Sequence, residues 1–109
     1  MKLLKLDDLK GHDVYEFCYA KDYPNHWNNS SLFLSTEGFL NLSPYLDKIF
    51  PSYHYYGPQK VMLSEWEKVK ELFLSSKNDD PLLSEFFINI DNWIAEDITL
   101  SDHFWILGV

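Results

Sequence analysis

The sequence contains no arginine, and all nine of its basic residues are lysine. Arginine supplies the two-pronged guanidinium contact that phosphate groups and guanine favour in nucleic-acid complexes. The 17 acidic residues leave a formal net charge of −8 and a pI near 4.7. Because neutralisation of phosphate dominates affinity for nucleic acids, direct nucleic-acid binding is not expected. An acidic chain suits a basic protein partner instead.

Cysteine is also scarce, since Cys18 is the only one in the chain. One cysteine cannot form an internal disulfide, which fits a reducing compartment, and we expect a cytoplasmic protein. The apolar runs are a few residues long, far short of the roughly 20 residues needed to cross a bilayer. The first residues lack the sustained apolar stretch of a secretory signal, so no secretory signal is predicted. No membrane association is predicted either.

Motifs for catalysis or cofactor binding are missing as well. The four glycines are isolated, so no phosphate-binding loop is present, and no two histidines have the i, i+4 spacing of a helical metal site. Cys18 lies in a predicted strand, where a lone cysteine is more often a buried apolar side chain than a nucleophile. We therefore predict a non-enzymatic protein with no catalytic residue, cofactor or metal. A small enzyme that uses Cys18 or a histidine is a third-ranked alternative.

The residues that are abundant predict a packed fold. Hydrophobic residues make up 46% of the chain and aromatic residues 17%, enough for one domain over residues 1–109. Strands are predicted over 14–20, 31–34, 59–63 and 103–109, with a further extended segment over 52–58. Helices are predicted over 36–50, 64–77 and 81–96. This order indicates an α+β fold, with a mostly antiparallel sheet and about three helices packed on it.

Local signals mark the helix ends. Pro44 lies inside the first helix, which is therefore predicted as one or two pieces. Ser64 and Glu67 have the spacing of a capping box at the start of the second helix. Asp80 is suited to cap the third helix, with Pro81 at its first position.

The net charge is concentrated toward the end of the chain. From residue 78 onward there is no basic residue, whereas residues 1–77 are nearly balanced. The acids of this last segment are Asp79, Asp80, Glu85, Asp91, Glu96, Asp97 and Asp102. Glu96 and Asp97 fall at the predicted C-terminal end of the third helix, where the helix dipole disfavours negative charge. The charge cluster either forms a binding surface or only keeps the helix solvated.

The third helix carries the main candidate for a binding surface. Helical periodicity predicts that its apolar face completes the core, through Leu82, Leu83, Phe86, Phe87, Ile90, Trp93 and Ile94. Ile88 falls on the opposite, polar face, where it resembles an apolar anchor with a charged rim. The predicted partner-binding residues of this segment are Glu85, Ile88, Asp91, Asn92, Glu96 and Asp97. In the alternative, Ile88 packs beneath a neighbouring loop.

Two aromatic residues are further candidates for partner binding. Trp27 lies in the polar loop 21–30, and Tyr55 lies in the aromatic segment 52–58. Tryptophan and tyrosine are frequent anchors of protein interfaces. Trp27 is either a packed anchor of its loop or an exposed contact residue.

Five segments together give the chain a resemblance to a known class of proteins. They are FLNLSPYLDKIF, YYG, VMLSEWEKV, DNWIAED and FWILGV. Their layout and residue types, over most of the chain, resemble bacterial immunity proteins of contact-dependent growth inhibition and related polymorphic toxin systems. The resemblance implies an inhibitor that binds a cognate toxin domain in the cytoplasm. Many such toxins are nucleases with basic clefts, which an acidic inhibitor would complement.

A second hypothesis needs no toxin. The chain would be a small acidic housekeeping or regulatory α+β protein that acts as a homodimer through its exposed aromatic residues. Whether the chain is a monomer or a homodimer stays open at the level of sequence.

Overall fold

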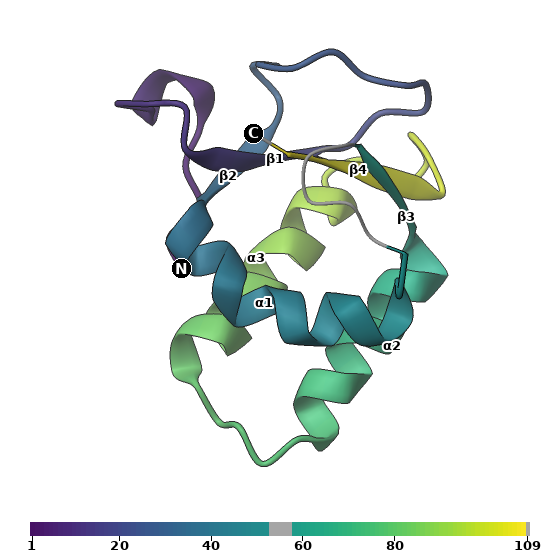
Figure 1. Cartoon of the computed structure of the whole chain (residues 1–109). Helices are drawn as coiled ribbons and strands as arrows, with labels where there is room; N and C mark the ends of the chain where they lie inside the picture. Colours follow the sequence, from purple (N-terminus) through teal and green to yellow (C-terminus); the bar gives the residue numbers. More distant parts are fainter. Residues whose placement is uncertain (53–57, 109) are drawn as a thin grey trace.

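The computed structural model describes residues 1–52 and 58–108 and confirms the α+β class (Figure 1). The strands are β1 (Val14–Cys18), β2 (Leu32–Ser35), β3 (Gln59–Met62) and β4 (His103–Leu107). The helices are α1 (Thr36–Ile49), α2 (Leu63–Ser75) and α3 (Pro81–Ala95), preceded by a short 3₁₀ helix, η1 (Leu6–Asp8). Residues 53–57 of the predicted extended segment lie outside the described part of the chain. None of the described helices is long and apolar enough to cross a membrane.

The four strands form one sheet in the order β2-β1-β4-β3, and each neighbouring pair is antiparallel. The last strand of the chain is therefore central, with Phe17 of β1 and Val61 of β3 in register with Ile106 and Phe104 of β4. The apolar segment near the C-terminal end is therefore paired along both of its edges. A central position removes the exposed backbone edge that favours aggregation.

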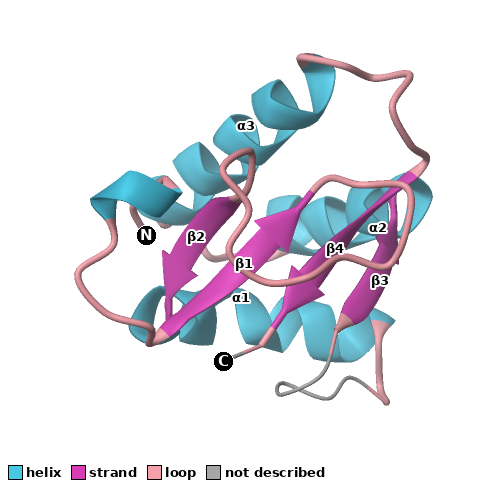
Figure 2. Ribbon diagram, turned by 90° about the horizontal axis from the view of Figure 1, so that it is seen from above, coloured by secondary structure: helices cyan, strands magenta, loops and turns pink. Residues whose placement is uncertain are grey.

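All three helices lie on one face of the sheet (Figure 1), and the loop between β1 and β2 crosses the other face (Figure 2). Because strand side chains alternate between faces, Phe17 and Phe104 point toward the helices, and Phe17 contacts Phe86 of α3 at 5.8 Å between ring centroids. On the opposite face Phe33 is buried beneath the stacked ring of Trp27. The sheet is thus covered on both sides.

Helix α1 runs without a break through Pro44. Proline has no N–H, so the carbonyl of Leu40 loses its usual donor four residues later. The hydroxyl of Ser43 donates to this carbonyl at 3.3 Å, on the solvent side of the helix. The helix is therefore one piece, the first of the two arrangements that the sequence allowed.

Helix α2 begins earlier than the sequence predicted. It starts at Leu63, directly after β3, and the Glu65 carboxylate accepts a hydrogen bond from the Met62 N–H at 2.9 Å. The predicted capping box of Ser64 and Glu67 is wrong, because the strand enters the helix without a loop and the cap lies two residues earlier, at Met62 and Glu65.

Helix α3 begins as predicted, with the Asp80 carboxylate accepting from the Leu82 N–H at 2.9 Å and Pro81 in the first turn. Its inner face is buried through Leu83, Phe86, Phe87, Ile90, Trp93 and Ile94. Leu82 was expected on this face but is 56% exposed. Leu82 lies on the outer side of the first turn of α3, the end of the helix farther from the sheet (Figure 1), whereas its neighbour Leu83 is fully buried.

Candidate functional site

The solvent-facing side of α3 gathers most of the predicted partner-binding residues. Glu85, Ile88, Asn92 and Glu96 are all exposed, and their spacings of three, four and four place them along one stripe of the helix surface. Ile88 is 58% exposed, so it is not covered by a neighbouring loop within the described chain. We call these four residues the α3 stripe. It presents one large apolar side chain between carboxylates.

Asp91 lies beside the stripe but has a different environment. Its Oδ2 is 2.8 Å from Nζ of Lys70 on α2, and the same Nζ is 2.6 Å from Oε1 of Glu67. Burial lowers the pKa of Lys70, but the hydrogen bonds and the negative charges of Asp91 and Glu67 together outweigh burial and raise the pKa above its ordinary value. The charge of Asp91 is therefore compensated, and the ion pair connects α2 to α3.

A hollow of about 250 Å³ lies between α2 and α3, bordered by Ile88. We call it the Ile88 hollow; its lining residues are Glu67, Lys70, Glu71, Phe73, Leu74, Ser84, Phe87, Ile88 and Asp91. Phe73 and Phe87 are buried, with ring centroids 5.4 Å apart, whereas Leu74 is 75% exposed. The hollow thus joins an aromatic floor to exposed aliphatic walls.

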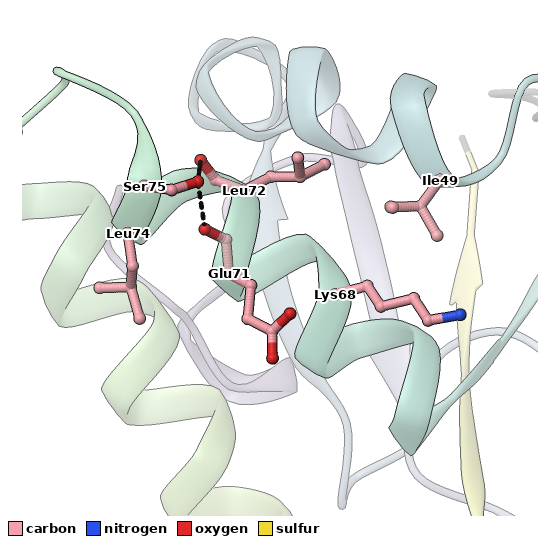
Figure 3. A pocket seen from close by; sticks show the side chains of 6 residues that line it. All are labelled: Ile49, Lys68, Glu71, Leu72, Leu74 and Ser75. Carbon is pink, nitrogen blue, oxygen red and sulfur yellow. Dashed lines mark hydrogen bonds between the residues drawn. The ribbon is translucent and has the colours of Figure 1, made fainter.

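Two further hollows flank α2. One of about 380 Å³ shares Glu67, Lys70 and Asp91 with the Ile88 hollow and extends along α3 to Ile98, which is 59% exposed. The other, of about 680 Å³, lies between α1 and α2 and is lined by Ile49, Lys68, Glu71, Leu72, Leu74 and Ser75 (Figure 3). In this third hollow the Ser75 hydroxyl donates to the carbonyls of Glu71 and Leu72. That serine is satisfied within its own helix and is not activated by a neighbouring base.

Trp27 lies on the opposite side of the sheet from the α3 stripe. Its ring stacks on Phe33 with centroids 5.9 Å apart, and the rings of His12 and His26 lie 4.7 and 5.6 Å away. Its φ of 68° is in the left-handed region, and its side chain is 39% exposed. Trp27 is therefore a packed anchor of its loop that also presents part of its ring to solvent.

Asp97 does not join the stripe. Asp97 lies in the turn after α3, where its backbone carbonyl accepts from the Tyr19 hydroxyl at 2.9 Å and its carboxylate accepts from Thr99. Tyr55 lies outside the described residues. The predicted set thus divides between α3, the turn after it and the far face of the sheet.

A buried carboxylate, Glu16, organises that far face and was not singled out from the sequence. It is 1% exposed. Its two oxygens accept from the backbone N–H groups of Trp27 and Asn28, at 2.6 and 3.1 Å, and from the side chains of Asn28 and Ser31, at 2.8 and 2.6 Å. Nδ1 of the His26 ring is 3.6 Å from the same carboxylate. The sequence did contain an indication of this buried carboxylate. A glutamate lies inside a strand predicted to be covered on both faces, and an asparagine-rich loop follows it.

Cys18 and His103 are two candidates of the small-enzyme alternative, and both are buried. Cys18 is 4% exposed, and burial raises the pKa of its thiol, an effect that outweighs the hydrogen bond with Ser31. Nε2 of His103 lies 2.8 Å from the Lys21 carbonyl and Nδ1 lies 2.7 Å from the Asp102 carboxylate. Both ring nitrogens are therefore engaged within the fold.

Comparisons with known proteins identify no family for this chain. The chain matches no model of a protein family, no curated protein and no solved structure. Among the described residues, no group of three or more histidine, cysteine, aspartate or glutamate side chains lies close enough to hold a metal ion.

Sequence reasoning located the α3 stripe but missed the contribution of α2. Glu67, Lys70, Glu71 and Leu74 border the Ile88 hollow together with Ile88. Their exposure follows from how α2 packs against α1 and α3, which the periodicity of a single helix does not reveal. Leu74, which falls outside the apolar stripe of its helix, was the one feature of the sequence that could have indicated an exposed apolar surface on α2.

Proposed function

We propose that this chain is a non-enzymatic, immunity-type inhibitor that binds and neutralises a cognate toxin domain with a basic surface in the cytoplasm. The observation that carries the proposal is the α3 stripe. An isoleucine that is 58% exposed lies there among carboxylates, on a helix without a basic residue. An apolar anchor within a charged rim is the usual arrangement of residues that dominate protein–protein binding.

Charge supports a basic partner rather than an acidic one. Helix α3 and the turn after it carry Glu85, Asp91, Glu96 and Asp97, and α2 carries three further acids against two lysines. Clustered carboxylates raise the rate of association with a positively charged surface and disfavour nucleic acid and anionic membranes. A toxin with a basic nuclease-like cleft is the partner class that the resemblance of the sequence implies.

The homodimer hypothesis is the second candidate, and the exposed part of Trp27 favours it. Tyr23, in the same loop, is 69% exposed. Two copies that met through this face would bury both aromatic residues. Light scattering that gives the mass of one chain at high protein concentration would contradict this candidate.

The proposal is tested by protection of cells. The reading frame adjacent to this gene is expressed as a candidate toxin, together with the wild-type chain or with the double variant Glu85→Lys, Glu96→Lys. Asp91 is left unchanged because it is paired with Lys70. The expected result is protection by the wild type and loss of protection by the double variant.

The matched control changes the same charge on the other side of the molecule. Asp7 in η1 and Asp22 in the β1–β2 loop are exposed, and Asp7→Lys with Asp22→Lys adds the same four units of charge. This control is expected to protect as well as the wild type. Protection by the α3 double variant at wild-type level would show that the α3 stripe is not the inhibitory surface.

A further inference from the structure

The Ile88 hollow combines features that favour one kind of side chain. Its floor consists of the phenyl rings of Phe73 and Phe87, which are 3% and 5% exposed, and its exposed walls are Leu74 and Ile88. Such a surface accepts an apolar stem.

The rim of the hollow is negatively charged after its own lysine is counted. Three carboxylates line it, those of Glu67, Glu71 and Asp91, and Lys70 is the one cation among the lining residues. Lys70 is bonded to Glu67 and Asp91. Within the described chain the Glu71 carboxylate makes no hydrogen bond or ion pair, and it is exposed. One carboxylate at the edge of an aromatic pocket is therefore open to an incoming cation.

We propose that the Ile88 hollow receives an arginine side chain of the partner protein, with the stem against Leu74 and Ile88 and the guanidinium directed to Glu71. This proposal rests on the proposed function, because it names the residue type by which a basic partner is anchored. Guanidinium fits such a site better than ammonium. It is planar, less strongly hydrated and able to donate two parallel hydrogen bonds to one carboxylate.

The occupant is a different protein rather than a second copy of this chain. The chain contains no arginine, so a second copy has no guanidinium to offer. Nucleic acid and anionic lipid would bring phosphate to a rim of carboxylates, which repel it. A basic protein surface is the occupant that satisfies both the apolar floor and the charged rim.

The test is a nuclear magnetic resonance titration of the ¹⁵N-labelled full chain with N-acetyl-arginine amide as the probe. N-acetyl-citrulline amide has nearly the same shape without charge, and N-acetyl-lysine amide has the charge without the planar fork. The arginine probe is expected to shift the backbone amides of Glu71, Leu74, Ser84 and Ile88 in a saturable manner. The citrulline probe is expected to bind about tenfold more weakly, since it lacks the charge-assisted hydrogen bond.

Two variants locate the site. Glu71→Gln is expected to abolish the preference for arginine over citrulline, and Ile88→Ala is expected to weaken both probes. Each changes an exposed side chain, so the fold should persist, which the unperturbed amide spectrum checks. Glu37→Gln on α1 makes the same chemical change away from the hollow and should leave the titration unchanged. An equal response to citrulline or lysine, or shifts spread over the whole surface, would overturn the proposal.

This experiment can fail independently of the proposed function. It uses small probes and no toxin, so a specific arginine response stands even if no cells are protected. Conversely, suppose that cells are protected in a manner that depends on Glu85 and Glu96 while the arginine probe gives no response. That result would support the proposed inhibitor function and contradict the proposed arginine site.

Discussion

Glu16 determines the shape of the surface loop that contains Trp27. A buried carboxylate is costly unless its oxygens accept hydrogen bonds from fixed donors. The donors come from Trp27, Asn28 and Ser31, and two of them are backbone N–H groups. This arrangement holds Trp27 at a φ of 68°, a backbone conformation that residues other than glycine rarely adopt.

Replacement of Glu16 by glutamine should therefore destabilise the fold. One of the two acceptor oxygens becomes an NH₂ group that faces donors, so at least one charged hydrogen bond is lost and a donor is left unpaired. The expected loss in free energy of unfolding is about 2–3 kcal/mol. Urea denaturation measures it, with Glu71→Gln as the control at an exposed position. A change below about 0.5 kcal/mol would show that the carboxylate is not required.

Cys18 tests the alternative of a small thiol enzyme. The thiol is buried and burial raises its pKa, so the reactive thiolate is scarce and hard to reach. Alkylation with iodoacetamide at mildly alkaline pH should be at least about a hundredfold slower in the native protein than in denaturant. Mass spectrometry follows the reaction. Labelling of the native protein at the denatured rate would restore the enzyme hypothesis.

At the scale of the elements, Lys70 is the one ion-paired residue in the described chain that connects α2 to α3. Two carboxylates converge on its Nζ, and the charged form of the lysine is favoured in the folded state. Glu67, Lys70 and Asp91 line both the Ile88 hollow and the neighbouring hollow along α3. Together with the contacts of Phe87 with Trp66 and Phe73, these ion pairs link the two helices that border the candidate interface.

Replacement of Lys70 by methionine should remove a pH-dependent part of the stability. Because the folded pKa is raised, the contribution is fully present below the ordinary lysine pKa of 10.5 and is lost as pH rises through the folded pKa above it. At neutral pH we expect a loss of about 1 kcal/mol in free energy of unfolding. Urea denaturation at neutral and at strongly alkaline pH measures the difference.

Lys68→Met on the same helix is the matched control, since Lys68 is exposed and forms no ion pair in the described chain. The gap in stability between the wild type and Lys70→Met should narrow above about pH 10.5, whereas the control should show no such gap. A gap that stays constant at all pH values would mean that Lys70 acts through packing of its stem.

Periodicity within single elements predicted much of what the elements do. The 3.6-residue pattern of α3 placed Phe86 and Ile90 inside and Ile88 outside, because one helix face meets the sheet whatever the rest of the fold. It failed at Leu82, which lies on the outer side of the first turn although its neighbour Leu83 is buried. The cap of α2 was misplaced because two glutamates, Glu65 and Glu67, offer alternative registers for the first turn.

At the scale of the whole molecule, the sequence predicted the fold class but not the order of the strands. Each strand is visible as a short apolar run, but the order β2-β1-β4-β3 depends on pairing between segments distant along the chain. The donors to Glu16 are likewise eleven to fifteen residues away from it. The α3 stripe could be predicted from the sequence because it lies within one helix. The α2 wall of the Ile88 hollow could not be predicted, because it depends on how two helices pack.

The central claim is that the α3 stripe attracts and binds a basic partner. Electrostatic attraction acts mainly on the rate of association, and salt screens it over about 10 Å at 0.1 M ionic strength. Stopped-flow mixing of the wild-type chain with the candidate toxin domain, at low and at physiological salt, measures this rate directly. The wild type should associate about tenfold faster at low salt than at physiological salt.

The same measurement on the variants decides the claim. With Glu85→Lys and Glu96→Lys, the rate at low salt should fall to nearly its high-salt value, whereas Asp7→Lys with Asp22→Lys should keep most of the salt dependence. The two variants have the same net charge, so a difference between them locates the attraction on α3. Equal rates and equal salt dependence for both double variants would contradict the account.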